Sequence, residues 1–162
     1  MTATLLTILL WFCALGCGLL AGLYFAFSAF IMTALEQAGL AHGIAAMNSI
    51  NRTILRSGFM PLFAGTTLGA AMLAPIGILQ PEGQAAICML VGGVVHVIGM
   101  FIVTMFKNVP LNNALAAANA TSGHAVAVWE RYLRVWTNWN HVRTLSSLLA
   151  SALFIAAIAL RE

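Results

Sequence analysis

The sequence predicts an all-α protein: a bundle of four transmembrane helices with amphipathic interfacial helices in the two inner loops. Two observations predict this fold. Of the 162 residues, 62% are apolar and only 7% are charged, whereas a typical soluble domain carries about 25% charged residues. The charged residues also leave four uncharged runs, at 1–35, 57–81, 83–106 and 144–160. Because a helix needs about 20 residues to cross the hydrocarbon core of a bilayer, each run fits one span.

The predicted spans are residues 5–35, 57–79, 83–106 and 143–160, and together they form a single integral membrane domain, 1–162. The first span is longer than a bilayer requires, which predicts that it tilts or projects from the membrane. Gly18 and Gly22 in the first span, and Gly65 and Gly69 in the second, have the spacing that lets helices approach closely. This spacing fits packing inside one bundle and, equally, a homo-oligomer formed through the glycine-rich faces.

The positions of the cations predict the topology. Six of the seven lysines and arginines lie between spans one and two or between spans three and four: Arg52, Arg56, Lys107, Arg131, Arg134 and Arg143. Basic loops face the cytoplasm. Both termini are therefore expected on the non-cytoplasmic side of a cytoplasmic (inner or plasma) membrane. Because the lipid bilayer accounts for the basic residues, no nucleic-acid partner is predicted.

Each inner loop is expected to contain a helix. In the first loop, residues 36–56, apolar residues recur every three or four positions, which is typical of an amphipathic helix at the membrane interface. In the second loop, residues 107–143, Pro110 suits the first turn of a short helix. Asn108 suits a cap or turn just before it.

The segment that leads into the fourth span carries the most informative pattern. At about 100° per residue, five side chains fall within about 80° of one another on one helical face. They are Trp129, Leu133, Trp136, Asn140 and Arg143, with Tyr132 and Trp139 on the flanks. Such a face could form a pocket in which the three tryptophans bind a small, flat aromatic ligand while Asn140 and Arg143 hold a polar or negative oxygen.

Three loop amides, Asn51, Asn108 and Asn112, lie on the same side of the membrane and are expected to help bind that ligand. The alternative is an ordinary aromatic belt with a flanking cation. In that case each amide is a cap or turn residue.

The histidines divide into a candidate base and a candidate ligand. His141 neighbours Asn140 and is the third candidate catalytic residue, with Asn140 and Arg143, although it lies 100° away from the aromatic face. Tyr24 is a more distant candidate for the base. His96, the one histidine inside a span, is either hydrogen-bonded within the bundle or a ligand for a metal or haem, which would need further ligands. No cofactor is predicted.

Four stretches together resemble the anthrone-oxygenase-like family of small four-span membrane proteins. They are Gly22-Leu-Tyr-Phe-Ala-Phe-Ser28, Met47-Asn-Ser-Ile-Asn-Arg52, Asn108-Val-Pro-Leu-Asn112 and Trp136-Thr-Asn-Trp-Asn-His-Val-Arg143-Thr144. The resemblance extends over residues 5–160, and the matching residues include Asn51, Asn108, Pro110, Asn112, Trp136, Asn140 and Arg143. Resemblance to the fungal branch implies O₂-dependent oxidation of a polyketide anthrone to an anthraquinone. Resemblance to the bacterial branch implies only a membrane protein.

The chemistry that the resemblance implies fits the predicted pocket. An anthrone loses a proton to give a stabilised anion, which can pass an electron to O₂ without a cofactor. An enzyme would supply an apolar slot, donors for the oxyanion and a modest base. The alternatives are a non-catalytic four-helix membrane subunit and a haem- or ligand-binding protein. A proton-coupled transporter is disfavoured because every glutamate lies outside the spans or at their edges.

Overall fold

The computed structural model describes residues 2–79, 83–118 and 123–161, and every element in those ranges is helical. The first long helix comprises α1 (Ala3–Ala26), η1 (Phe27–Ile31) and α2 (Met32–Gln37). The next two helices are α3 (Leu40–Ile54) and α4 (Phe59–Leu79). The second long helix comprises α5 (Gln84–His96), η2 (Val97–Ile102), η3 (Thr104–Asn108) and α6 (Val109–Ala117), and the third comprises α7 (His124–Arg131), η4 (Tyr132–Trp136) and α8 (Thr137–Ala159).

Four of these helices are long and apolar enough to span a membrane: Ala3–Gln37, Phe59–Leu79, Gln84–Ala117 and His124–Ala159. The expected fold, an all-helical bundle with four spans, is confirmed. Large apolar side chains such as Leu15, Leu19 and Leu68 are more than 60% exposed on the outside of the bundle. Such a surface suits lipid and would be an aggregation hazard in water.

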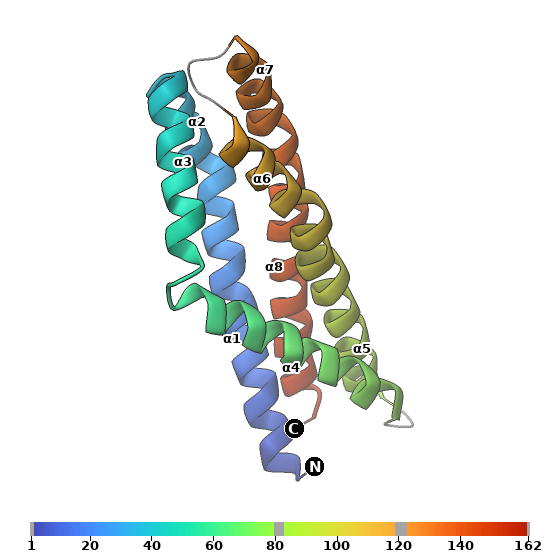
Figure 1. The fold of residues 1–162 in the computed structure, drawn as a ribbon. Helices are drawn as coiled ribbons and strands as arrows, with labels where there is room; N and C mark the ends of the chain where they lie inside the picture. The colour runs from blue at the N-terminus through green and yellow to red at the C-terminus, as the bar shows by residue number, and fades with distance from the viewer. Residues whose placement is uncertain (1, 80–82, 119–122, 162) are drawn as a thin grey trace.

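The two chain ends lie at the same end of the bundle, and α3, α6 and α7 gather at the opposite end (Figure 1). Helix α1 packs mainly on α8, α4 packs on α5, and α5 also packs on α8. Helix α4 runs obliquely across the other long helices (Figure 1). The three long helices of 34 to 36 residues are each about 50 Å long at 1.5 Å per residue. They therefore exceed the ~30 Å of hydrocarbon by about 20 Å.

The first inner loop forms the expected helix, α3, and the structure shows what that helix contacts. Gly43, Ile44 and Met47 are its buried residues, and α3 packs against α2, α6 and α7. Gly39, between α2 and α3, has a φ of 87°, which is accessible to glycine at little cost. The chain can therefore reverse direction here and place α3 beside α2.

Asn108 is neither a helix cap nor a turn residue, so that alternative for it is wrong. The helix continues without a break from Gln84 to Ala117, and Asn108 has helical backbone angles and makes no capping hydrogen bond. Its side chain is instead buried and donates from Nδ2 to the carbonyl oxygen of Trp136, 3.2 Å away. Pro110 lies in the first turn of α6 directly after η3, and because the helix is continuous here, its missing N–H removes one helical hydrogen bond.

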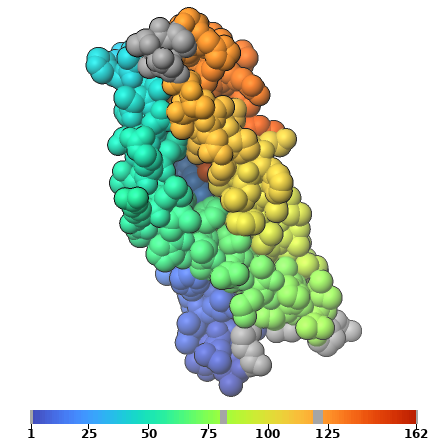
Figure 2. All heavy atoms as spheres, viewed as in Figure 1, coloured from blue at the N-terminus to red at the C-terminus, as the bar shows by residue number. Residues whose placement is uncertain are grey.

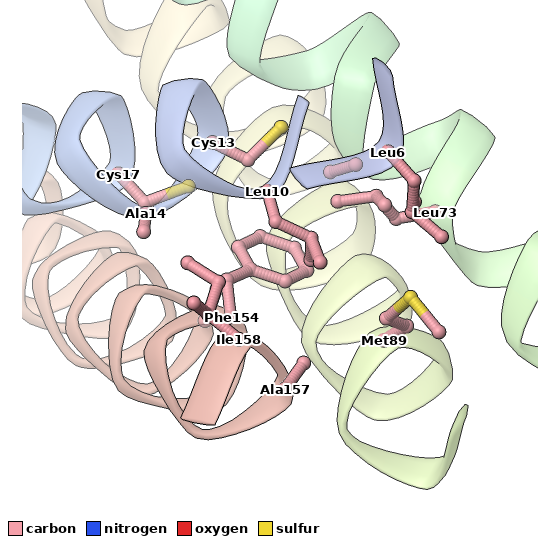
Figure 3. Close-up of a cluster of buried hydrophobic side chains, with 12 residues drawn as sticks. Leu6, Leu10, Cys13, Ala14, Cys17, Leu73, Met89, Phe154, Ala157 and Ile158 are labelled. Carbon is pink, nitrogen blue, oxygen red and sulfur yellow. The ribbon is translucent and has the colours of Figure 1, made fainter. Parts of the chain in front are cut away.

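Two apolar clusters hold the bundle together at different heights. The first lies toward the chain termini, where Leu10, Leu73, Met89 and Phe154 from four helices meet and are fully buried (Figure 3). The second lies among η1, α2, α3, α6, α7 and η4, where Met47, Leu115 and Tyr132 are buried. A third, smaller cluster includes Tyr24 and Met100. Two buried polar residues of α8, Asn140 and Arg143, contact Tyr24 of this third cluster.

Candidate functional site

The candidate site is built around Arg143, a cation 6% exposed in α8. Its guanidinium carbon lies 4.4 Å from the centre of the Tyr24 ring and 5.1 Å from the centre of the Trp136 ring. Nη2 donates to Asn140 Oδ1 at 2.6 Å, and Nη1 lies 3.5 Å from Thr104 Oγ1, at the limit of a hydrogen bond. Two aromatic rings and two polar side chains therefore fix the position of the guanidinium.

Asn140 joins this guanidinium to the first span. Its Nδ2 donates to the carbonyl oxygen of Tyr24 and to Ser28 Oγ, both at 2.6 Å, while its Oδ1 accepts from Arg143. Asn140 is fully buried. The two residues that the sequence placed one turn apart as catalytic candidates thus form one hydrogen-bonded unit. Tyr24, Ser28 and Thr104 complete this unit. They belong to other helices than Asn140 and Arg143, so the helical periodicity of one segment cannot predict these contacts.

The charge of Arg143 has no counter-charge within the described part of the chain. Its ionisable neighbours are the phenols of Tyr24 and Tyr132, and Glu36 and Glu130 are exposed. A cation–π contact contributes about 0.5–2 kcal/mol, whereas burying an ion costs several kcal/mol. The rings, together with the hydrogen bonds to Asn140 and Thr104, offset that cost without neutralising the charge. An anion or a strongly negative oxygen beside Arg143 would supply the charge that these neutral groups do not.

Three buried polar atoms on Arg143, on Trp136 beside it and on the Asn108 side chain bound to Trp136 have no hydrogen-bond partner among residues 2–79, 83–118 and 123–161: Arg143 Nε, Trp136 Nε1 and Asn108 Oδ1. In most proteins buried polar atoms are paired, so each exception needs an explanation. Arg143 Nε and Trp136 Nε1 are free donors on two side chains packed against each other. A pair of free donors suits an oxygen acceptor on a ligand.

The helices depart from α-helical geometry around this site. Four π-helical segments occur in the described residues, η1, η2, η3 and η4, although π-helices are rare and often mark functional sites. Asn108, the last residue of η3, donates to Trp136, the last residue of η4. The carbonyl of Tyr24, just before η1, accepts from Asn140. Two amide side chains thus link helices at the edges of these π-helical segments.

The tryptophans on the predicted face do not all reach Arg143. Trp129, Tyr132 and Trp136 form a stacked row with ring centres 5.9 and 5.6 Å apart, and only Trp136 of the three lies over Arg143. Leu133, expected in this row, is only half-buried, and Tyr132 takes its place. The π-helical turn of η4 inserts an extra residue per turn, which shifts the buried face from the α-helical phase.

The remaining predicted residues are placed as follows. Asn112 Oδ1 accepts a hydrogen bond from the Tyr132 hydroxyl at 2.7 Å, and Asn51 also lies against that hydroxyl. Trp139 is half-buried, and the Lys107 ammonium nitrogen lies 5.0 Å from the centre of the Trp139 ring. His141 is exposed, unlike its buried neighbour Asn140. The structure therefore brings Trp136, Asn108, Asn140 and Arg143 together and leaves Trp139 and His141 outside this group.

His96 is fully buried, with its Nδ1 3.4 Å from Cys17 Sγ of α1. The glycines around it closely approach neighbouring helices: a Cβ atom on Gly92 would lie 2.9 Å from Phe154, and one on Gly93 would lie 2.5 Å from the Ala70 carbonyl oxygen. Within the described ranges, no three His, Cys, Asp or Glu side chains converge as metal ligands. The glycines one turn from His96 therefore serve close packing between helices.

A recess leads toward the buried core from the side of the bundle. Figure 2 shows it between α3 and the start of α4 on one side and the helix containing η3 and α6 on the other, with atoms of α1 and α8 visible at its bottom. Asn140 and Arg143 belong to α8 and Tyr24 belongs to α1. A separate cavity of about 270 Å³ lies between α6 and α7 and contacts the aromatic row through Tyr132.

The fold and the site together define a class: a four-span helical bundle with a buried arginine–asparagine pair among aromatic rings. The chain matches the family model described as anthrone oxygenase over residues 52–153. Because the match covers more than half of the sequence, the protein belongs to the anthrone oxygenase family. Neither a curated protein nor a solved structure matches the chain.

Proposed function

We propose that the protein is a cofactor-independent oxygenase that oxidises a flat aromatic ketone of the anthrone type beside Arg143. The observation that carries this proposal is the buried guanidinium held between Tyr24 and Trp136, which has no counter-anion among the residues that the structure describes. An enolate is flat, largely apolar and negatively charged at one oxygen. It would supply the missing charge while its rings pack on aromatic walls.

The proposed reaction proceeds from this enolate. Loss of a proton from the CH₂ carbon of the ketone gives the anion, which transfers one electron to O₂ and forms a carbon radical and superoxide. These combine and take up a proton to give a hydroperoxide, which loses water and leaves a second carbonyl. In sum, one CH₂ group and one O₂ become one C=O group and one H₂O.

Each residue of the site has a part in this proposal. Arg143 stabilises the oxyanion, and Trp136 Nε1 provides a second donor. Asn140 and Thr104 position the guanidinium. The proposal assigns no role to His141, which is exposed. In the proposal the proton passes to a water molecule rather than to a side chain of the site.

The test is O₂ uptake by the purified protein in lipid nanodiscs with unsubstituted anthrone, together with the absorbance of the anthraquinone formed. Nanodiscs without protein supply the rate of spontaneous oxidation. We expect Arg143→Gln to lower the protein-dependent rate about 10²–10³-fold, the usual effect of losing an oxyanion donor. Arg134→Gln is the matched control, because Arg134 is exposed on the same long helix, and its rate should equal that of the wild type.

Two results would overturn the proposal. One is a wild-type rate no higher than that of empty nanodiscs. The other is full activity of Arg143→Gln. Tight binding of anthraquinone without O₂ uptake would instead favour a non-catalytic ligand-binding protein.

A further inference from the structure

The cavity between α6 and α7 lies at the end of the bundle opposite the chain termini (Figure 1). Its volume is about 270 Å³, and its described lining includes neither Asn140 nor Arg143. Pockets for drug-sized ligands measure about 300–1,000 Å³, so this cavity suits a smaller molecule. Both helices lie beyond about 30 Å of helix length from the end with the termini. With that end at one membrane surface, a ligand reaches the cavity from water.

The wall that α6 contributes is apolar and made of small side chains. Leu111, Ala114, Ala117 and Ala118 line the cavity from this side. Because they are three or four residues apart, they share one face of the helix. An alanine side chain ends at Cβ, so this face leaves space in front of α7. The apolar body of a ligand would pack against it.

The wall that α7 contributes carries positive charge. His124, Val128 and Arg131 line the cavity at helical spacings of four and three residues, which places them on one face. No acidic side chain belongs to the described lining. A guanidinium presents two parallel N–H donors, and this arrangement matches the two oxygens of a carboxylate. The cavity thus has an apolar wall facing a cationic one.

Tyr132 contributes a surface without a free polar group. The residue is 1% exposed, and its hydroxyl already donates to Asn112 Oδ1 at 2.7 Å. Its ring stacks on Trp129, with ring centres 5.9 Å apart. A ligand in the cavity would therefore meet the Tyr132 ring rather than its hydroxyl, and it would lie close enough to Trp129 to change the fluorescence of that tryptophan.

We infer that the cavity between α6 and α7 is a binding site for small apolar carboxylates. The carboxylate pairs with the Arg131 guanidinium, and the apolar body lies against the alanine face of α6 and the Tyr132 ring. This site is separate from the one at Arg143, and the inference does not depend on the proposed oxidation.

Two probes of equal size test the inference, 3-cyclohexylpropanoate and 3-cyclohexylpropanamide, which differ only in the charged group. Each is titrated against tryptophan fluorescence of the protein in phosphatidylcholine nanodiscs, and partition into empty nanodiscs is measured separately. We expect the wild type to bind the carboxylate at least tenfold more tightly than the amide. Arg131→Gln should reduce this ratio to about threefold or less and leave the affinity for the amide unchanged.

Ala114→Leu should weaken the binding of both probes at least tenfold, because the larger side chain fills the cavity. Arg134→Gln and Ala116→Leu are the matched controls, since both residues are exposed on the same long helices and neither lines the cavity. They should keep the wild-type affinities. Thermal unfolding of each variant establishes that it folds, and Ala117→Leu replaces Ala114→Leu if the latter does not.

Three results would overturn the inference. They are no saturable binding of the carboxylate by the wild type, an unchanged ratio in Arg131→Gln, and unchanged affinities in the variant with the filled cavity. None of them bears on O₂ uptake with anthrone, so the proposed function stands or falls by its own test.

Discussion

At the scale of single residues, Asn140 and Arg143 depend on each other. Without Asn140 Oδ1, the guanidinium loses its shortest hydrogen bond, and the carbonyl of Tyr24 and the hydroxyl of Ser28 lose their amide donor. A hydrogen bond to a charged group contributes about 1.5–3 kcal/mol. The pair is therefore both a structural link between α1 and α8 and the source of the positive charge at the site.

The ring and the hydroxyl of Tyr24 have separable roles. The ring lies under Arg143, whereas the hydroxyl is 3.5 Å from Met100 Sδ, a weak acceptor. Tyr24→Phe should therefore retain the melting temperature in detergent and the affinity for anthraquinone. Tyr24→Leu should lower both, because it removes the cation–π contact, which contributes about 0.5–2 kcal/mol. Loss of anthraquinone binding in Tyr24→Phe would show instead that the hydroxyl contacts the ligand.

At the scale of elements, close approach between helices explains several glycines. A Cβ atom on Gly93 would lie 2.5 Å from the Ala70 carbonyl oxygen and 3.0 Å from the Ala74 nitrogen, so it would clash with the backbone of α4. Gly69 approaches Cys13 Sγ on α1 in the same way. The glycine spacing of the second span thus serves packing inside the bundle. By contrast, a Cβ atom on Gly22 would meet nothing within 4 Å.

We expect Gly93→Ala to destabilise the protein by about 1–3 kcal/mol, the usual cost of overpacking, because a backbone cannot move aside as a side chain can. Gly22→Ala is its control and should be neutral or slightly stabilising, since alanine has the higher helix propensity. Melting temperatures of both variants in the same detergent provide the measurement. Equal melting temperatures for the two variants would contradict the α4–α5 packing.

The positions of the spans and part of the site could be predicted from the sequence. Charge-free runs located all four spans, because length and apolarity are local properties. Helical phase brought Trp136, Asn140 and Arg143 onto one face correctly. It misplaced Leu133 and Tyr132 because a constant 100° per residue cannot anticipate a π-helical turn.

At the scale of the whole molecule, the three long helices and the oblique α4 fix the depth of the site. The depth of the site follows from the helix rise of 1.5 Å per residue. Measured along its own helix from the end of the bundle that holds the chain termini, each site residue lies about 24–32 Å away: Tyr24, Thr104 and Arg143. The hydrocarbon core is about 30 Å thick. If that end lies at one membrane surface, the site lies close to the other, and α3, α6 and α7 project beyond it.

The distribution of cations leads us to propose that this projecting end faces the cytoplasm. A fluorescent protein and a periplasmic phosphatase, fused in turn to the C-terminus after Glu162, distinguish the two orientations in a bacterial host. We expect phosphatase activity and no fluorescence. A fluorescent, phosphatase-negative cell would place both termini in the cytoplasm, because four spans keep them on one side.

The recess between α3, α4 and the η3–α6 helix opens on the flank of the bundle (Figure 2). An apolar substrate of the proposed kind dissolves in the bilayer, so the protein would meet it there rather than in bulk water. Its turnover would then follow surface-dilution kinetics. At constant total substrate, added empty vesicles would lower the rate, and the apparent KM would be constant only as a mole fraction of lipid.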